Sequence, residues 1–265
     1  MSIEKVLVVG SGLMGSGIAQ VCAQSGYSVY LMDVDKKALH AGLDNISWSV
    51  EKFVEKGMLK EPKEIIMSRI QPVDVITEFD EIDFVIEAVY EDLDLKKSVL
   101  SSISRNCSEG TILASNTSSI PITKISIAVK RPENVLGCHF FSPVPKSKVI
   151  EVIKGEQTSD GTVEMASRFC RSLGKEIIAI NRDVAGFALG RINHASTVEA
   201  IRLVEMGIIS VEDVDKGMRL GFGRPMGPFE TLDMVGLEIT YKAMSTIYEE
   251  TGNDKFRPPE LFKRK

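Results

Sequence analysis

From residue 5 to about residue 180, hydrophobic residues come in short continuous runs that alternate with longer amphipathic stretches. The runs are rich in β-branched residues, which is typical of parallel strands buried on both faces. Several of the intervening stretches have a helical period, so the pattern predicts a doubly wound α/β sheet of Rossmann type. The strands are expected at 5–9, 28–32, 69–73, 84–89, 111–114, 135–141, 149–153 and 176–180.

Two helical stretches, instead of one, separate the second predicted strand from the third. Apolar residues between 39 and 53 mark one face of a long helix, and a second helical stretch surrounds 65–67. The polar side of this helical insert carries Lys52, Lys56, Lys60 and Lys63. These lysines are either an ordinary solvated face or a basic rim for an anionic substrate such as a phosphorylated carrier.

After residue 186 the pattern becomes helical throughout. Helices are expected at 187–206 and 232–251, with a further one opened by a capping box at Ser210–Asp213. We place the junction at 181–183, which gives domains 1–183 and 184–265. The fold class is therefore a Rossmann-type sheet with a helical insert, followed by an all-α domain.

The first predicted strand ends in a glycine-rich loop of the form Gly-x-Gly-x-x-Gly, which opens into a helix. Gly10 would make the tight turn, Gly12 would let the backbone approach a pyrophosphate, and Gly15 would let helix and strand pack closely. The phosphate would rest on free N–H groups at the helix start. The candidate cofactor contacts in this loop are Gly10, Gly12, Leu13, Met14 and Gly15.

Asp33 follows the second predicted strand, roughly 20 residues past the glycines, as a dinucleotide site requires. Its carboxylate would accept from the ribose hydroxyls and repel a 2′-phosphate, which favours NAD. Lys36 and Lys37 lie close enough to leave NADP open as the alternative. A βαβ unit that binds no nucleotide is the remaining interpretation.

Polar residues gather where the fourth and fifth predicted strands end. Glu91 and Lys96 follow the fourth strand, and the segment 115–119, Ser-Asn-Thr-Ser-Ser, follows the fifth. Ligands of such sheets collect beyond the carboxyl ends of the strands. Ser118 or Ser119 could equally serve only to cap the next helix.

Two apolar runs each contain one ionisable group, His139 in 135–141 and Glu151 in 149–153. Burying a lone charge costs on the order of several kcal/mol, so the simplest arrangement is that the two meet. The carboxylate would then fix the imidazole tautomer and leave the other ring nitrogen as a general base near neutral pH. Separate partners for each group are the alternative.

The chain of 265 residues suits two domains, and its net charge of −5 argues against nucleic acid or an anionic membrane as a partner. No stretch approaches ~20 consecutive apolar residues, so neither a membrane span nor a signal peptide is expected. The 4 cysteines are scattered without a Cys-x-x-Cys motif, and the 3 histidines make a metal site improbable. We therefore expect reduced thiols in a cytoplasmic protein.

The chain resembles the short-chain L-3-hydroxyacyl-CoA dehydrogenase family, which includes bacterial 3-hydroxybutyryl-CoA dehydrogenases. The resemblance is nearly collinear from Lys5 to about Phe262. Its motifs are Gly-Ser-Gly-Leu-Met-Gly-Ser-Gly-Ile-Ala-Gln (10–20), Ser-Asn-Thr-Ser-Ser (115–119), His-Phe-Phe-Ser-Pro-Val-Pro (139–145), Val-Ile-Glu-Val-Ile (149–153) and Pro-Met-Gly-Pro (225–228).

The resemblance implies an N-terminal NAD domain and a helical C-terminal domain that forms a homodimer. It implies that His139 is the general base paired with Glu151, and that Ser118 contacts the substrate near the reacting carbon. The NAD contacts that it implies are Asp33, Glu91, Lys96 and Asn116, with Ser142 near the nicotinamide. Lys52 and Lys56 would then face coenzyme A.

The sequence departs from the family at two asparagines. Gly190 stands where the family has an Asn that binds the substrate oxygen, and Asn193, one turn further on, is a candidate substitute. Ser142 stands where the family has an Asn near the nicotinamide. The Gly- and Lys-rich segment that closes the family's sequences does not follow Lys265.

Three functions follow from these observations. The first is NAD-dependent oxidation of a short-chain 3-hydroxyacyl-CoA, or the reverse reduction. The second is the same chemistry on a small hydroxyacyl unit held by an acyl-carrier protein, with Gly190 making room for an altered substituent. The third is a non-catalytic NAD-binding relative, against which the paired His139 and Glu151 speak.

Overall fold

The structure is a computed structural model that describes residues 3–74 and 81–263. Contacts divide the chain into two compact units. The N-terminal unit contains 1–117 and 121–183, and the C-terminal unit contains 118–120 and 184–265. The short segment 118–120 thus groups with the C-terminal unit although the sequence on either side of it belongs to the N-terminal one.

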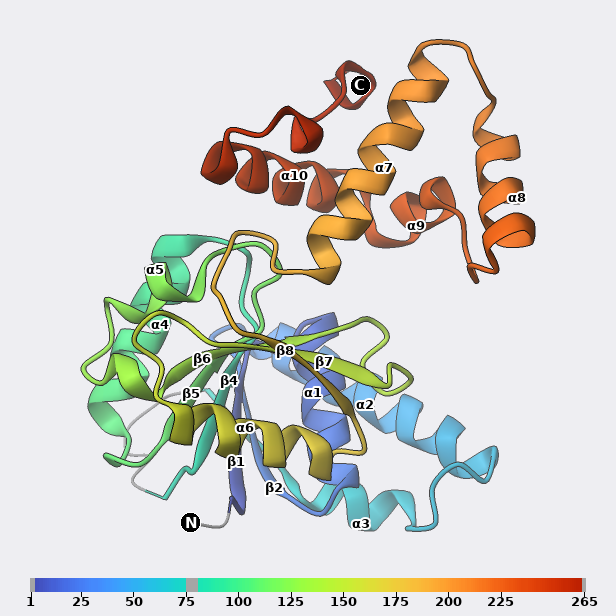
Figure 1. Cartoon of the computed structure of the whole chain (residues 1–265). Coiled ribbons are helices and arrows are strands. Elements are labelled where there is room, and N and C mark those ends of the chain that lie inside the picture. Colours follow the sequence, from blue (N-terminus) through green and yellow to red (C-terminus); the bar gives the residue numbers. More distant parts are fainter. Residues whose placement is uncertain (1–2, 75–80, 264–265) are drawn as a thin grey trace. The chain divides into compact units, whose positions relative to one another are not determined.

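The N-terminal unit is built on a sheet of eight described strands in the order β3-β2-β1-β4-β5-β6-β7-β8 (Figure 1). Neighbours from β3 to β6 are parallel, whereas β7 runs antiparallel to β6 and parallel to β8. This confirms the predicted doubly wound sheet. The strands are β1 (Lys5–Val9), β2 (Ser28–Met32), β3 (Ile70–Val73), β4 (Phe84–Glu87), β5 (Ile112–Ser115), β6 (Val135–Phe140), β7 (Val149–Ile153) and β8 (Glu176–Ile180).

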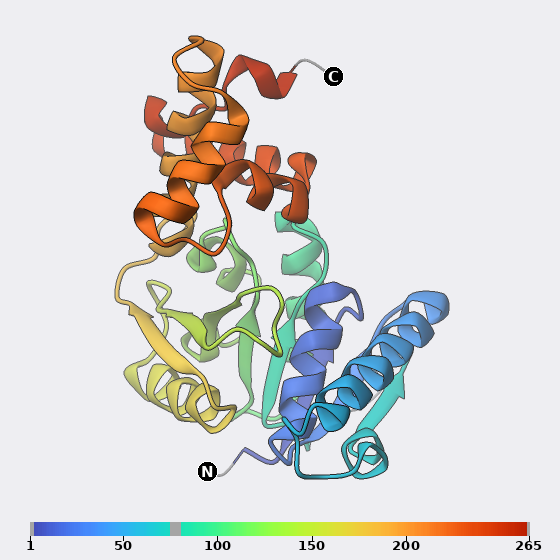
Figure 2. The same cartoon turned by 90° about the vertical axis from the view of Figure 1, so that its right-hand side faces the viewer.

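The helices of this unit are α1 (Leu13–Gln24), α2 (Lys36–Glu55), α3 (Lys63–Ser68), α4 (Leu93–Asn106), α5 (Ile122–Ser126) and α6 (Asp160–Ser172). The predicted helical insert is present as α2 and α3, and Figure 2 shows α2 lying alongside α1. The hydrophobic pattern did not predict α6. The sequence does contain a start signal for this helix, since serine is a preferred N-cap residue. In the structure the Ser159 side chain caps the helix by accepting from the Thr162 N–H.

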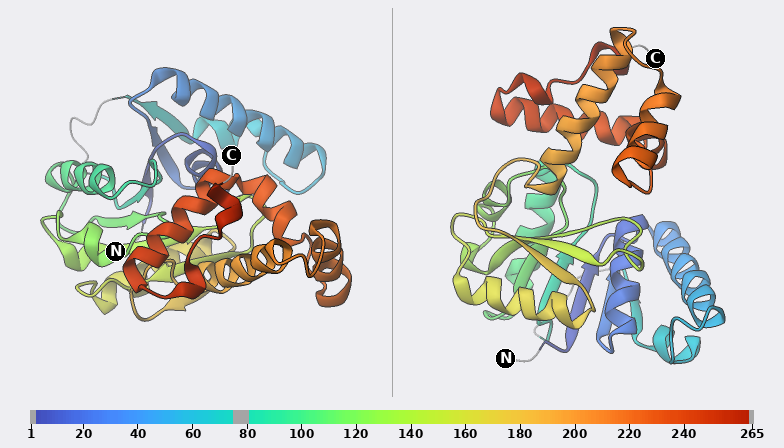
Figure 3. Two further views of the ribbon diagram at one scale, coloured as in Figure 1. Left: turned by 90° about the horizontal axis from the view of Figure 1, so that it is seen from above. Right: turned by 45° about the vertical axis from the view of Figure 1, so that its right-hand side comes forward.

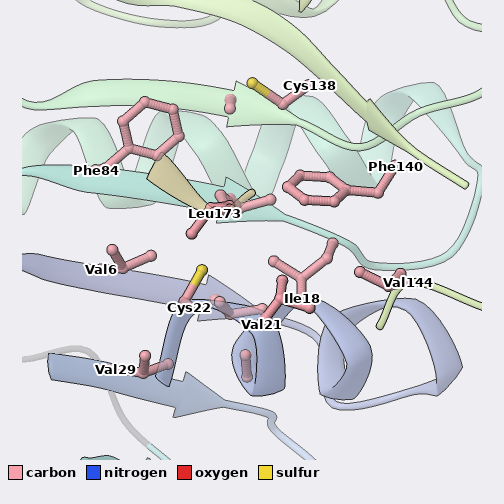
Figure 4. Packing of buried hydrophobic residues seen from close by; sticks show 14 of the residues in the cluster. Val6, Ile18, Val21, Cys22, Val29, Phe84, Cys138, Phe140, Val144 and Leu173 are labelled. Atoms are coloured by element: carbon pink, nitrogen blue, oxygen red, sulfur yellow. The ribbon is translucent and has the colours of Figure 1, made fainter. Parts of the chain in front are cut away.

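Both faces of the sheet are buried. Val6 and Val8 of β1 join Ile18 of α1 and Phe169 of α6 in one apolar cluster, while Leu7, between them on β1, is equally buried. Figure 4 shows Ile18 directed toward Phe140 of β6, with Val144 beside it. The connection from β6 to β7 is therefore anchored on α1, and this fixes one wall of the site described below.

The C-terminal unit contains α7 (Leu189–Glu205), α8 (Val211–Phe222), α9 (Pro228–Val235) and α10 (Leu237–Thr251), drawn in orange to red in Figure 3. Ser210 caps α8 by accepting from the Asp213 N–H, as expected. The prediction of one helix over 232–251 was wrong. Gly236, with φ of +98°, divides that stretch into α9 and α10, because this backbone conformation interrupts a helix and favours glycine.

In the part of the chain that the structure describes, no helix is both long and apolar enough to cross a bilayer.

Candidate functional site

The glycine-rich loop joins β1 to α1 and is held tightly against neighbouring backbone. Gly10 has φ of +97°, and a Cβ there would lie 2.6 Å from the carbonyl oxygen of Ala88. A Cβ on Gly15 would lie 1.7 Å from the carbonyl oxygen of Gly10. Larger residues at these two positions would force the backbone apart, so glycine is required for the loop to close over the end of β1.

The start of α1 suits an anionic ligand. Its N-cap is Gly12, so no side chain caps the first turn. Leu13, the first helical residue, is 76% exposed, and Met14 packs against the apolar core. Helix N-termini carry free N–H groups and a partial positive charge, and both favour a phosphate.

Asp33, just after β2, is tied to the same loop. Its Oδ2 accepts from the backbone N–H and the hydroxyl of Ser11, both at 2.8 Å, and its Oδ1 accepts from the Asp35 N–H. Burial alone would raise the pKa of Asp33, but the hydrogen bonds from Ser11 and Asp35 outweigh it and hold the pKa below its ordinary value. Asp33 is therefore a carboxylate at neutral pH, as ribose binding requires. Lys36 pairs with Asp74 at 2.7 Å.

A buried ionic cluster lies at the carboxyl end of β4. Glu87, fully buried, accepts from Lys96 Nζ at 2.8 Å and from the Ser115 hydroxyl at 2.6 Å. Lys96 is 1% exposed and also lies 3.3 Å from Glu91, which accepts from the Thr117 hydroxyl at 2.6 Å. The structure thus brings Glu91 and Lys96 together at the end of β4, as expected from the sequence. The Lys96 ammonium is paired with the carboxylates of Glu87 and Glu91.

Asn116 joins two strands at the same edge of the sheet. Its side-chain oxygen accepts from the Phe140 N–H at 2.8 Å, and its own N–H donates to the carbonyl of Glu87. Phe140 directly follows His139 on β6. Asn116 therefore fixes the backbone beside the histidine.

His139 and Glu151 face each other across the antiparallel pair β6–β7. Nδ1 of His139 lies 2.8 Å from Oε2 of Glu151, the carboxylate is fully buried, and the imidazole is 12% exposed. The structure brings together the two groups that the sequence placed in separate strands. Phe141 packs against the imidazole, with ring centroids 4.5 Å apart.

The geometry assigns the proton on the imidazole. An ionised carboxylate only accepts, so Nδ1 of His139 carries the hydrogen that bonds to Glu151. Nε2 is then the basic nitrogen of the neutral ring. Such an arrangement can remove a proton from a bound hydroxyl and stabilise the resulting imidazolium.

A cavity of about 440 Å³ lies within the N-terminal unit, bounded by α1, α2 and the connection from β6 to β7. Its volume is within the range of small-molecule sites. Its walls are largely apolar and include Trp48, Phe53 and Pro143, and Ser142 also lines it. Lys52, Lys56 and Lys146 line the same cavity, so positive charge surrounds an apolar interior.

Lys52 is held in its charged form. Its Nζ donates to Glu55 one turn along α2 at 2.7 Å, and this hydrogen bond raises the pKa of Lys52 above its ordinary value. Lys56 follows the last residue of α2. Both predicted substrate lysines therefore belong to one cavity, which the pattern of residues could not show.

Ser118 and Asn193 belong to the C-terminal unit. A Cβ placed on Gly190, in the first turn of α7, would meet only the Ser118 carbonyl oxygen, at 3.9 Å. Asn193 is exposed on the next turn, where its carbonyl accepts from the Thr197 hydroxyl at 3.0 Å. Gly190 thus leaves open space beside Ser118.

Sequence reasoning missed two side chains that the structure makes prominent. Glu87 is a lone carboxylate in an apolar strand, which is the same signal that singled out Glu151. Gln20 lies on the buried side of α1 and lines the cavity, but it was treated only as part of the glycine-rich motif.

Comparison with known families gives matches over nearly the whole chain. Residues 5–184 match the family model for the NAD-binding domain of 3-hydroxyacyl-CoA dehydrogenase. Residues 186–265 match the model for the C-terminal domain of 3-hydroxyacyl-CoA dehydrogenase.

Individual relatives agree with the family models. A probable 3-hydroxybutyryl-CoA dehydrogenase of Bacillus subtilis is 37% identical over 100% of this chain and 92% of its own. The mitochondrial hydroxyacyl-coenzyme A dehydrogenase of Mus musculus is 39% identical over 97% of this chain and 84% of its own. The crystal structure of (S)-3-hydroxybutyryl-CoA dehydrogenase from Ralstonia eutropha superposes with a TM-score of 0.93 at 37% identity, covering 99% of this chain and 93% of that one.

Proposed function

Because the chain belongs to the 3-hydroxyacyl-CoA dehydrogenase family, and is thus an NAD-dependent oxidoreductase, we propose that it interconverts a short-chain 3-hydroxyacyl-CoA and its 3-oxoacyl-CoA. The observation that carries the proposal is the hydrogen bond between His139 and Glu151. Short acyl groups are supported by the names of relatives, several of which are 3-hydroxybutyryl-CoA dehydrogenases. Nothing in those names favours the carrier-protein substrate or the non-catalytic alternative.

His139 is proposed to act as the general base. In oxidation, Nε2 would take the proton from the substrate C3 hydroxyl, and NAD, when bound, would supply the hydride acceptor. Glu151 keeps Nδ1 protonated throughout and offsets the positive charge that the ring gains. In reduction, the same Nε2 returns the proton to the forming hydroxyl.

The loop residues Gly10, Gly12, Leu13, Met14 and Gly15 are proposed to hold the pyrophosphate, with Asp33 on the ribose. The uncapped start of α1 and the lowered pKa of Asp33 support this assignment. Glu91, Lys96, Asn116 and Ser142 are proposed to contribute to the rest of the cofactor site.

Coenzyme A is proposed to occupy the cavity between α1 and α2, with Lys52 and Lys56 on its phosphates. Lysines beside an apolar interior suit a ligand that combines phosphate groups with a flexible arm. Ser118, with a catalytic role near the reacting carbon, and Asn193 are proposed as further substrate contacts.

The C-terminal unit, with a domain boundary after residue 183, is proposed to form a homodimer. Large apolar residues are exposed on it, among them Leu220 at 81% and Phe222 at 79%, both on α8. A second copy of this chain would bury them. Sedimentation of the protein should give the mass of a dimer, and Leu220→Asp should shift it toward the monomer. We also propose a cytoplasmic location, supported by the scattered cysteines.

Oxidation of NADH with acetoacetyl-CoA tests the proposed reaction. The same acyl group on an acyl-carrier protein is the matched comparison. We expect turnover of the CoA ester at an ordinary enzyme rate, at least tenfold faster per active site than the carrier-bound ester. Turnover of neither substrate, by protein that binds NADH, would overturn the proposal.

A further inference from the structure

Gln20 is a buried side chain whose hydrogen-bonding capacity the protein does not use. The residue is 2% exposed and lines the cavity between α1 and α2. Its Nε2 has no hydrogen-bond partner among the residues that the structure describes. A buried amide without a partner destabilises a protein, so each such group calls for an explanation.

The neighbouring polar residue of the cavity wall shows the contrast. Ser16 lies one turn earlier on α1, is 6% exposed, and lines the same cavity. Its hydroxyl bonds to the carbonyls of Gly12 and Leu13, at 2.8 Å and 3.3 Å, and is therefore satisfied within the helix. Of these two polar groups on α1, only the amide of Gln20 offers unused donors.

The chemistry of the cavity indicates what those donors bind. Apolar and aromatic side chains line the cavity together with Gln20, and lysines line it as well. The terminal torsion of glutamine is soft, so the –NH₂ group can turn toward an acceptor that enters the cavity. Under the proposed function the occupant is a phosphopantetheine arm, whose strongest neutral hydrogen-bond acceptors are its two amide carbonyls.

We infer that Gln20 is a positioning residue that donates a hydrogen bond from its side-chain amide to an amide carbonyl of the pantetheine arm. This inference rests on the proposed function and deepens it. Gln20 does not touch the reacting atoms. It holds the arm in place along α1, in the ground state and in the transition state alike.

Gln20→Met tests the inference, because methionine keeps the length of the side chain and removes its donors. When a lost interaction was equally strong in the ground state and the transition state, KM rises and kcat is unchanged. We expect KM for acetoacetyl-CoA to rise about fivefold to tenfold, which lies within the range for one neutral hydrogen bond, with kcat within about twofold of the unchanged protein. With S-ethyl acetothioacetate, a thioester that has no amide, the variant and the unchanged protein should have equal kcat/KM.

Gln24→Met is the matched control. Gln24 lies one turn further along α1, and its Nε2 is likewise buried without a partner among the described residues, but it does not line the cavity. Both variants remove an unsatisfied donor, so both should unfold at a temperature equal to or above that of the unchanged protein. Only Gln20→Met should weaken substrate binding.

Trp48 gives a readout that needs no turnover. It is the only tryptophan of the chain and lines the cavity, so its fluorescence reports what binds there. Titration with pantetheine should change the emission, and Gln20→Met should raise the dissociation constant by the same fivefold to tenfold factor. Equal affinity of the two proteins for pantetheine would overturn the inference. Failure of the proposed function would appear differently, as absent turnover of acetoacetyl-CoA by the unchanged protein.

Discussion

Two fully buried glutamates of the N-terminal unit are each paired with a basic side chain, and the pairs differ in what the base can do. Glu87 lies 2.8 Å from Lys96, and Glu151 lies 2.8 Å from His139. The side chain of Lys96 is 1% exposed, whereas the side chain of His139 is 12% exposed. As side-chain types, an imidazole exchanges its proton near neutrality, and an ammonium does so only at far higher pH.

The two pairs therefore differ in their capacity for proton transfer. The Glu87–Lys96 pair is sealed, and further bonds from Ser115 and to Glu91 saturate it. In the His139–Glu151 pair the imidazole is less deeply buried, and Nδ1 is the ring nitrogen that faces the carboxylate. Burial of a charged pair therefore does not by itself indicate an active site; the base must also be able to exchange its proton.

The largest expected effect comes from removing the imidazole of His139. His139→Gln should lower kcat/KM about 10³-fold, because general-base catalysis contributes typically 10²–10⁴ in rate. The affinity for NADH, measured by fluorescence titration, should change less than about threefold. Activity that survives this substitution would show that another group is the base.

Breaking the Glu87–Lys96 pair should lower stability, apart from the role of Lys96 in the proposed cofactor site. Lys96→Met leaves the carboxylate of Glu87 buried without its cation and should reduce the free energy of unfolding by about 3–5 kcal/mol. Urea denaturation measures this. Lys97→Met, on the adjacent residue of α4, is the control and should cost less than about 0.5 kcal/mol. The double variant Glu87→Gln with Lys96→Met should recover part of the loss, and equal instability of single and double variants would contradict the pairing.

Glu151→Gln should have a smaller effect on rate than the loss of His139. The amide can no longer stabilise the imidazolium or enforce the protonated Nδ1, so kcat/KM should fall about 10²-fold with the base still in place. The measurement is the pH profile of kcat/KM, in which the limb assigned to the base should move to lower pH. An unchanged profile would mean that Glu151 does not act on the histidine.

Replacing Asp33 should have the smallest effect, because its carboxylate is half-buried and its hydrogen bonds offset the cost of burial. Its pKa is lowered in the folded protein, so its contribution to stability is complete above the ordinary carboxyl pKa of about 4 and is lost as pH falls through the lowered value. The difference in unfolding free energy between the unchanged protein and Asp33→Asn should therefore shrink below about pH 4. At neutral pH the variant should bind NAD about tenfold more weakly. A constant difference across acid pH would contradict this assignment.

Much of the fold was predictable because its determinants are local. Continuous β-branched runs gave the strands, and the glycine-rich loop with Asp33 after the second strand indicated the dinucleotide domain. The break at Gly236 was missed because a single glycine inside an amphipathic pattern does not reveal its own φ. Helix α6 was missed although Ser159 signalled its start.

The candidate site was predictable only where burial imposes a strong cost. The pairing of Glu151 with His139 could be predicted because each is the only ionisable residue in an apolar run. Glu87 gave the same signal, but its partner Lys96 lies on a polar helix and so did not look buried. The cavity that contains Gln20 depends on how α1, α2 and the connection from β6 to β7 pack, which no local pattern reports. The roles of the site residues stay predictions.

The reversal of direction at β7 constrains how this protein can be redesigned. His139 and Glu151 are opposite partners in the β6–β7 ladder, and a shift of one residue would turn the carboxylate to the other side of the sheet. The linking segment 141–148 also supplies a wall of the cavity. Residue exchanges of similar size in this segment therefore leave the strand register intact, whereas a single inserted or deleted residue risks separating His139 from Glu151.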